Sequence, residues 1–205
     1  MDEKSSNSLE KPQIKGILKD DKVIILDPRG IQEFHENSYI GSIEKDENDR
    51  DILVLEAIET LLLIERQRIL FYEENDENGA QYTFEKALEY FSDYDERLWQ
   101  KYIIYMDLRK RGYIVRAGYG DGIDFRVYKR GADVEKDSAK FLIYPVFEGD
   151  PIELKDLDKI SRVALSSRKD LIVATVDRLS KPIYYSVNKF QIINNVELDE
   201  SEYAR

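Results

Sequence analysis

The stretch LRKRGYIVRAGYGDGIDFRVY, residues 108–128, decides the fold of the second half of the chain. Its first residues end a helix, because cations at 109–111 suit the last helical turn and Gly112 is a typical stop. After Gly112 the apolar residues recur every second position instead of every third or fourth. Residues 113–118 and 125–129 are therefore predicted strands joined by a glycine-containing connection.

The residues around this stretch also show apolar residues at helical spacing in some segments and at strand spacing in others. We expect the helix that ends at Gly112 to begin at Asp93, because four apolar residues at helical spacing share one face: Trp99, Tyr102, Ile103 and Met106. An amphipathic run predicts a further helix at 153–168. Short apolar or alternating runs predict strands at three places: 141–147, 171–176 and 183–190. The fold class is therefore α+β, with a helix packed against a mixed sheet.

The first half of the chain predicts a smaller α/β domain. Residues 16–27 are typical of a hairpin that turns at Asp20 and Asp21. A helix is expected to begin at Asp51 as its N-cap, because six apolar residues recur mostly three or four apart: Leu53, Leu55, Ile58, Leu61, Leu62 and Ile64. A second helix is expected from Thr83 to Phe91.

These patterns divide the chain into four parts. Residues 1–13 are polar and are expected to form a flexible tail, and residues 191–205 form an acidic tail. Between them we expect an N-terminal α+β domain at 14–95 and a C-terminal domain at 96–190.

The composition excludes several classes of protein. The 205 residues contain no cysteine and one histidine, so neither a disulfide scaffold nor a thiolate zinc site is available. No apolar run approaches the roughly 20 residues of a membrane helix, and the polar N-terminus lacks the apolar segment of a signal peptide. We therefore expect a cytoplasmic protein.

The net charge of −11 is unevenly distributed. Residues 1–100 carry a net charge of −13, whereas residues 101–196 carry +5. An acidic total argues against a nucleic-acid partner, because phosphates are neutralised by Lys and Arg. The basic second half nevertheless permits RNA binding there.

Three kinds of chemistry compete for these residues. A metal-dependent nuclease site would use the Glu153-x-Lys155 pair with Asp124 or Asp133, but this pair falls at a predicted helix start and the match is expected to be accidental. Catalysis by the single histidine, His35, lacks a nearby nucleophile, so a structural or solvent-facing role is expected. The third is a metal-free site containing Tyr128 and Lys169, which spacing alone would leave as surface residues.

Residues 108–128, followed by SAKFLIYPV at 138–146, RVALSSRKDLIVATVD at 162–177 and IYYSV at 183–187, resemble the catalytic domain of archaeal tRNA-splicing endonucleases. The N-terminal segment from about residue 14, including GIQEFHENSYIGS and LEAIETLLLIERQRI, is similar to that family's amino-terminal domain. The resemblance implies a C-terminal nuclease domain. It also implies an enzyme that cuts precursor tRNA at intron–exon junctions with bulge-helix-bulge geometry, without a metal or other cofactor, and leaves a 2′,3′-cyclic phosphate and a 5′-hydroxyl.

The same resemblance assigns the site residues. Tyr128 matches the general base of a Tyr-His-Lys triad, and Lys169 matches the lysine that stabilises the transition state. Ser138 stands where the family has its histidine, and a serine is a poor proton donor near neutral pH. Three arginines are expected to bind RNA: Arg116, Arg126 and Arg162, of which Arg162 matches an arginine that pinches a bulged base.

Ser138 leaves two interpretations open. The chain is either a catalytic subunit weakened at one position, natural or introduced, or a structural subunit that positions RNA. Retention of Tyr128 and Lys169 favours the first. The resemblance also implies a homo-oligomer or a hetero-oligomer with a related subunit, and the alternating Ile183, Tyr185 and Val187 form a candidate edge strand for pairing. The turn at 177–181, acidic in many relatives, carries Arg178 and Lys181 here.

Overall fold

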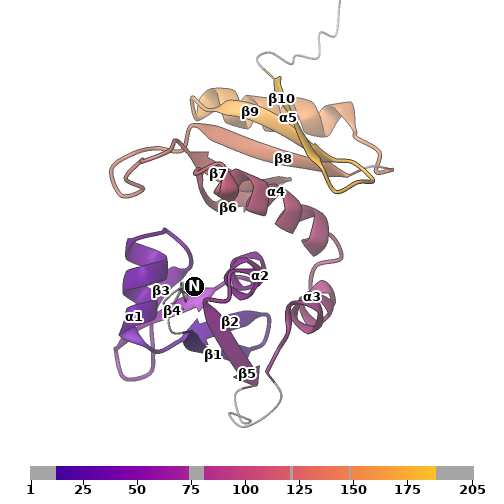
Figure 1. Cartoon of the computed structure of the whole chain (residues 1–205). Helices are drawn as coiled ribbons and strands as arrows, with labels where there is room; N and C mark the ends of the chain where they lie inside the picture. The colour runs from indigo at the N-terminus through magenta and orange to yellow at the C-terminus, as the bar shows by residue number, and fades with distance from the viewer. Residues whose placement is uncertain (1–12, 74–80, 121, 148, 188–205) are drawn as a thin grey trace, which may run out of the picture.

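The computed structural model describes residues 13–73, 81–120, 122–147 and 149–187. The expected tails at 1–13 and 191–205 lie outside these residues, apart from residue 13. Two five-stranded sheets are stacked along the molecule, with helices on both sides of the upper one (Figure 1). Among the described residues, none of the helices has the length and apolar character needed to cross a membrane.

The N-terminal sheet has the strand order β3-β4-β2-β1-β5. The predicted hairpin is confirmed, because β1 and β2 pair antiparallel around the turn at Asp20 and Asp21. β1 also pairs with β5 in parallel, which places the last strand of this sheet at its edge. The strands are β1 (Ile14–Lys19), β2 (Lys22–Ile25), β3 (Ser42–Lys45), β4 (Asp51–Leu55) and β5 (Ile69–Glu73).

One helix of the N-terminal part begins later in the chain than the sequence predicts. The helix expected from Asp51 begins at Ala57, and residues 51–55 form β4 instead. The helix expected from Thr83 to Phe91 is confirmed, with Thr83 as its N-cap. These helical elements are α1 (Pro28–Gly30), the π-helix η1 (Ile31–Glu36), α2 (Ala57–Glu65) and α3 (Phe84–Ser92).

The C-terminal sheet is mixed, as predicted, with the order β10-β9-β8-β7-β6 and one parallel pair, β8 with β9. The part of the expected last strand at 188–190 lies outside the described residues. Its elements are β6 (Ile114–Gly120), β7 (Ile123–Tyr128), β8 (Phe141–Phe147), α5 (Leu154–Ser166), β9 (Asp170–Val176) and β10 (Pro182–Val187).

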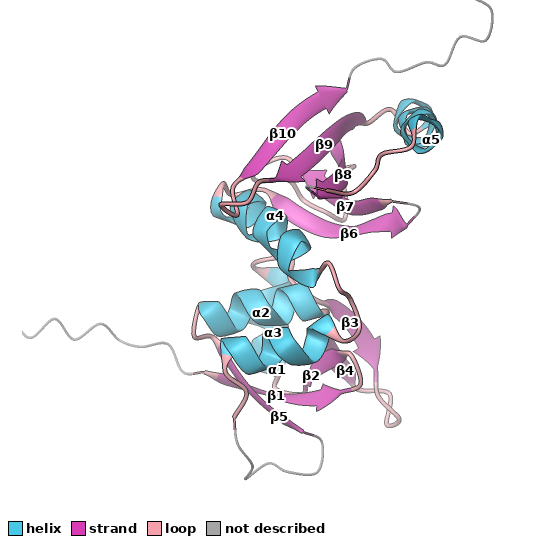
Figure 2. Cartoon of the chain, turned by 90° about the vertical axis from the view of Figure 1, so that its right-hand side faces the viewer, coloured by secondary structure: helices cyan, strands magenta, loops and turns pink. Residues whose placement is uncertain are grey.

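Helices cover both faces of the C-terminal sheet. Leu142 packs with Ile160 and Ala164 of α5, whereas Ile143, the next residue of β8, belongs to the core around α4 (Leu98–Lys110). Because successive strand residues point to opposite faces, α4 and α5 lie on opposite sides of the sheet (Figure 2).

Helix α4 lies between the two sheets and is shared by both cores (Figure 1). One apolar cluster runs from Ile14 of β1 to Val176 of β9 and includes the buried face of α4. Tyr102 and Ile103 of the predicted face are buried, but Trp99 is exposed and Met106 is only half-buried. The buried face is wider than predicted and includes four further residues: Leu98, Ile104, Tyr105 and Leu108. The helix also begins at Leu98 instead of Asp93. A helix packed on two sides needs a wider apolar surface than one stripe.

Candidate active site

Tyr128 is the last residue of β7, and its side chain is almost completely buried. It pairs across the ladder with Ile114 at the start of β6. Its ring belongs to a small apolar cluster with Ile114 and Ala139, which we call the Tyr128 cluster. Three half-buried residues pack against this cluster: Tyr39, Ala132 and Val134. Within the described residues, the Tyr128 hydroxyl forms no hydrogen bond.

Lys169 stands between the end of α5 and the start of β9, and the helix end fixes its position. The Lys169 N–H donates to the Ala164 carbonyl at 2.9 Å, and the Arg168 N–H donates to the Leu165 carbonyl at 3.1 Å. These two bonds form a Schellman motif, with Arg168 in the left-handed position at φ 54°. The Lys169 ammonium, half-buried, donates to the Ser167 carbonyl at 3.2 Å and has no ion-pair partner in the part of the chain that the structure describes.

The sheet brings Tyr128 and Lys169 to the same end. The Lys140 N–H donates to the Val127 carbonyl at 2.9 Å, and the Asp170 N–H donates to the Lys140 carbonyl at 3.0 Å. Tyr128 and Lys169 therefore lie on either side of the beginning of β8. Two strand spacings separate their backbones, which is about 10 Å.

Ser138 lies at the same end of the sheet, in the connection between β7 and β8, and it is exposed. The adjacent Asp137 is held by the loop itself, because its carboxylate accepts the Asp133 N–H at 2.9 Å. The Lys136 ammonium forms an ion pair with the Asp133 carboxylate in the same turn, at 2.6 Å. The loop thus presents the Ser138 side chain to solvent from an internally hydrogen-bonded turn.

The three arginines predicted to bind RNA occupy different surroundings. Arg162 is exposed on α5 and pairs with Asp158, at 2.9 Å. Arg126 lies two residues before Tyr128, donates to the Ala117 carbonyl at 2.7 Å and stacks its guanidinium 5.0 Å above the Tyr119 ring. Arg116 reaches the N-terminal part, where it donates to the carbonyl oxygens of Tyr39 and Gly41 at 3.2 and 2.6 Å.

The acidic residues considered for a metal site are dispersed. Glu153 is the N-cap of α5, Asp133 is paired with Lys136, and Asp124 lies 3.5 Å from Lys101. Among the described residues, no three His, Cys, Asp or Glu side chains gather as a metal site would require. His35 lies in η1, where its Nδ1 is 3.0 Å from the Gly41 carbonyl oxygen.

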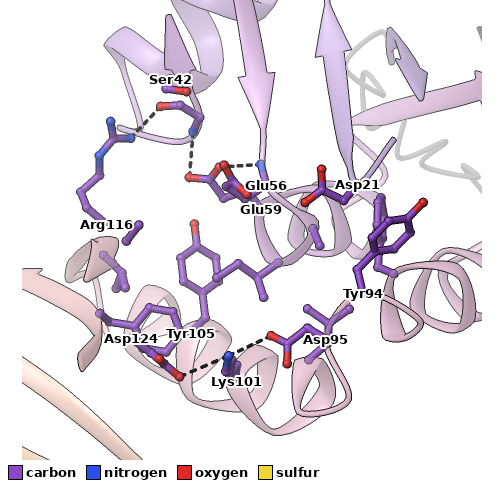
Figure 3. A pocket seen from close by; sticks show the side chains of 18 of the residues that line it. Asp21, Ser42, Glu56, Glu59, Tyr94, Asp95, Lys101, Tyr105, Arg116 and Asp124 are labelled. Atoms are coloured by element: carbon purple, nitrogen blue, oxygen red, sulfur yellow. Dashed lines mark hydrogen bonds and ion pairs between the residues drawn. The ribbon is translucent and has the colours of Figure 1, made fainter. Parts of the chain in front are cut away.

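A cleft of about 410 Å³ separates the N-terminal part from α4 and β6 (Figure 3). Glu59 is buried at its edge and accepts the N–H groups of Gly41 and Glu56, at 2.9 and 3.1 Å. Burial raises the pKa of Glu59 above its ordinary value. Burial also raises the pKa of Asp124 on the opposite wall, although Lys101 opposes this shift.

Segment 38–41 is the feature that the sequence did not single out. Besides Arg116, Arg109 of α4 donates to the Ser38 carbonyl at 2.7 Å. Tyr39 has a left-handed backbone at φ 52°, and Gly41 has one at φ 78°. The glycine was the available indication of a turn here, but nothing in the pattern indicates which distant residues contact it.

The comparisons with known proteins identify the family of both halves of the chain. Residues 98–185 match the model of the tRNA intron endonuclease catalytic C-terminal domain, and residues 14–85 match that of the tRNA intron endonuclease N-terminal domain. A tRNA-splicing endonuclease of Methanococcus vannielii is 31% identical over 182 residues, covering 89% of this chain and 97% of the relative.

Relatives from other archaea are similar to the same extent. The tRNA-splicing endonuclease of Methanothermobacter thermautotrophicus is 32% identical over 177 residues, 86% of this chain and 97% of its own length. That of Saccharolobus islandicus is 32% identical over 183 residues, 86% of this chain and 98% of its own length. The chain therefore belongs to the tRNA intron endonuclease family and carries that family's catalytic domain.

Proposed function

We propose that this chain is a subunit of a tRNA-splicing endonuclease that cleaves precursor tRNA at intron–exon junctions. The 2′-hydroxyl at the junction attacks the adjacent phosphorus, the bond to the 5′-oxygen breaks, and the products carry a 2′,3′-cyclic phosphate and a 5′-hydroxyl. Tyr128 accepts the proton of the 2′-hydroxyl, and Lys169 stabilises the negative charge that develops on the phosphate oxygens. The reaction as proposed involves no metal ion.

The observation that carries this proposal is the meeting of Tyr128, Lys169 and the Ser138 loop at one end of the C-terminal sheet. Tyr128 and Lys169 are about 40 residues apart in sequence, yet the ladder around Lys140 places them on either side of β8. The Lys169 ammonium has no carboxylate partner among the described residues, so its charge is available to a phosphate. The Tyr128 hydroxyl is likewise unoccupied by the described part of the chain.

Ser138 weakens this site, because the leaving 5′-oxygen needs a proton that a serine does not supply near neutral pH. In this chain the 5′-oxygen takes its proton from solvent water instead. Loss of a general acid typically lowers the rate about 10²- to 10⁴-fold. Asp137, next to it, does not replace the acid in our proposal, since its carboxylate already accepts a backbone N–H.

Cleavage of a precursor tRNA in EDTA tests the proposal. The purified chain is mixed in stoichiometric amounts with a precursor that contains an intron flanked by bulges, and the products are resolved by size and end chemistry. We expect slow release of defined exon halves with cyclic phosphate ends. Cleavage that requires a divalent ion would contradict the metal-free mechanism.

The Ser138→His substitution is the sharper test. If Ser138 occupies the proton donor's place, this variant should cleave at least about ten times faster than the parent chain. Glu135→His is the matched control, because it adds an imidazole to the same exposed loop three residues away. Equal rates for the parent chain and both variants would refute the assignment of position 138.

The serine at position 138, where the family has a histidine, also favours a second candidate, a non-catalytic subunit that positions RNA. Arg162, Arg126 and Arg116 would then contribute to binding without cleavage. Precursor tRNA that binds tightly but stays intact, with the parent chain and with Ser138→His, would support this alternative.

The proposed assembly is an oligomer of this chain, or of this chain with a related subunit. β10 is an edge strand, and Ile183 and Tyr185 on it are 45% and 53% exposed, which suits strand pairing with a second subunit. The Asp177 carboxylate caps its own turn by accepting the N–H groups of Leu179 and Lys181, at 2.9 and 2.8 Å. An acidic contact from this turn to a neighbour is therefore not part of the proposal.

A further inference from the structure

Tyr39 is the one residue of the N-terminal part that packs against the Tyr128 cluster, among the described residues. The other members come from the start of β6, from β7 and from the loop between β7 and β8, and apart from Tyr128 they are aliphatic: Ile114, Ala132, Val134 and Ala139. The ring of Tyr39 is thus the only other aromatic ring in this described packing. Its removal would open a void beside this cluster.

Tyr39 lies near the loop that carries Ser138, because Ala132 and Val134 of that loop pack against the same cluster. The pKa of Lys136 is raised mainly by its hydrogen bond to Asp133 and, to a smaller extent, by the nearby Tyr39 hydroxyl. Tyr39 therefore packs in the same small cluster as the strand end that carries Tyr128 and the loop on which position 138 stands.

The backbone of Tyr39 is held in a conformation that a tyrosine does not adopt readily. A φ of 52° is uncommon for a bulky side chain and persists only where the surroundings determine it. Here the Tyr39 N–H donates to the His35 carbonyl at 2.8 Å, and the Tyr39 carbonyl accepts a bond from Arg116. Two nearby carbonyls are also bound, that of the preceding Ser38 by Arg109 and that of Gly41, two residues further on, by Arg116.

We propose that Tyr39 is a positioning residue for Tyr128, so that the N-terminal part of the chain helps to build the active site. The inference rests on the proposed function of Tyr128. Arg109 and Arg116 hold segment 38–41 against the C-terminal part by hydrogen bonds. In this position the Tyr39 ring packs against the Tyr128 cluster. The ring of Tyr128 is thereby kept in one orientation toward the scissile junction. Misplacement of a reacting group by about 1 Å can lower a rate about 100-fold.

Substitutions at Tyr39 separate the ring from the backbone. Tyr39→Asn removes the ring but suits a left-handed backbone, so the variant should fold. Tyr39→Phe keeps the ring and removes the hydroxyl. Tyr72→Ala is the matched control, because Tyr72 is a half-buried tyrosine of β5 that does not pack against the Tyr128 cluster.

The first measurement is single-turnover cleavage at saturating precursor tRNA, with Ser138→His as the parent. We expect Tyr39→Asn to be about 10- to 100-fold slower. Its affinity for the RNA should stay within about twofold, because no phosphate-binding cation is lost. Tyr39→Phe and Tyr72→Ala should remain within about threefold of the parent. Equal losses in Tyr39→Asn and Tyr72→Ala, or a loss in affinity instead of rate, would overturn the inference.

The second measurement does not depend on cleavage. Carbon-13 labelling of tyrosine rings, with the Tyr128 signal assigned from Tyr128→Phe, reports the packing of that ring directly. The signal should shift or broaden in Tyr39→Asn and stay unchanged in Tyr72→Ala. If the parent cleaves no precursor, the proposed function fails, while this signal still decides the packing: an unchanged Tyr128 signal in Tyr39→Asn overturns the inference, and a changed one supports it.

Discussion

Tyr128 and Lys169 stand on either side of the same strand, but the chain holds them in place by different means. Lys169 is positioned locally, by a Schellman motif that involves only the last residues of α5 and the turn after it. Tyr128 is positioned by residues distant in sequence, including Tyr39 from the N-terminal part. The contacts that place Tyr39 come in turn from Arg109 and Arg116.

This difference predicts how each residue responds to change elsewhere. A local motif keeps its geometry as long as the helix is formed, whereas a cluster built from three segments depends on the contact between the two sheets. Disturbing segment 38–41 should therefore affect the Tyr128 side of the site and leave the Lys169 side intact.

Removal of the Lys169 charge should have the largest effect. In the proposed mechanism Lys169→Ala loses the cation that stabilises the transition state, so single-turnover cleavage should fall about 10²- to 10³-fold. Lys155→Ala, an exposed lysine at the other end of α5, is the matched control and should cleave normally. Comparable rates for both variants would remove Lys169 from the mechanism.

Arg116→Met should mainly destabilise the contact between the two parts. The carbonyls of Tyr39 and Gly41 would lose a charged donor, and such hydrogen bonds contribute about 1.5–3 kcal/mol each. Since Gly41 retains its contact with His35, we expect the free energy of unfolding in urea to fall by about 2–4 kcal/mol. Arg126→Met, the cross-strand neighbour whose one bond is exposed to water within its own hairpin, should lose at most about 1.5 kcal/mol. Equal losses would mean that segment 38–41 is held mainly by other contacts.

Glu59→Gln should change how stability depends on pH. Burial raises the pKa of Glu59 in the folded protein, so the folded protein retains this proton more readily than the unfolded chain does. The stability of the parent chain should therefore fall as the pH rises through this window, and glutamine removes that contribution. The parent's stability relative to Glu59→Gln should increase as the pH is lowered from about 7 to about 5.

Urea unfolding at three pH values in that range measures this difference. Asp124, whose pKa burial also raises, is present in both proteins, so its contribution cancels. A difference that stays constant or decreases toward pH 5 would show that Glu59 is not the buried carboxyl responsible.

The fold was predictable wherever one sequence period extends over a whole element. Strand β8 begins and ends at the predicted residues, whereas residues 51–55 were predicted to be helical and form β4. Leu53 and Leu55 are compatible with a helical stripe that continues into α2. The deciding interaction is the reciprocal cap between Glu56 and Glu59, which starts the helix after the strand. The sequence also offers Asp51 as an N-cap, and that residue was wrongly predicted to be the helix start.

The site was predictable only in part, for a related reason. Tyr128 and Lys169 were identified by their resemblance to a family, because their spacing alone indicates nothing. Tyr39 and Arg109 lie about 70 residues apart in sequence, and neither periodicity nor composition reports a contact between such segments. Helix ends illustrate the same limit: α2, α4 and α5 all end in Schellman motifs, but only α4 has a glycine, Gly112, in the left-handed position.

Glycine substitutions at these helix ends should have the smallest effect on stability. Arg168 and Gln67 occupy the left-handed position after α5 and α2, where an L side chain costs about 1–2 kcal/mol relative to glycine. A glycine would relieve this cost, but part of the stability gained is offset because glycine has greater conformational freedom in the unfolded chain. We expect Arg168→Gly and Gln67→Gly each to raise the free energy of unfolding by about 0.5 kcal/mol. Arg66→Gly, at an ordinary φ of −83° in the preceding residue, should lower it by a similar amount.

The cleavage rate of Arg168→Gly connects this small effect to the site. If the Schellman motif alone positions Lys169, the glycine variant should keep the parent's rate while gaining stability, because the two hydrogen bonds of the motif involve backbone groups only. A slower but more stable variant would show that the Arg168 side chain contacts the RNA. A less stable variant would show that it makes a stabilising contact in the folded protein, and the Lys169 side of the site would then depend on more than its local motif.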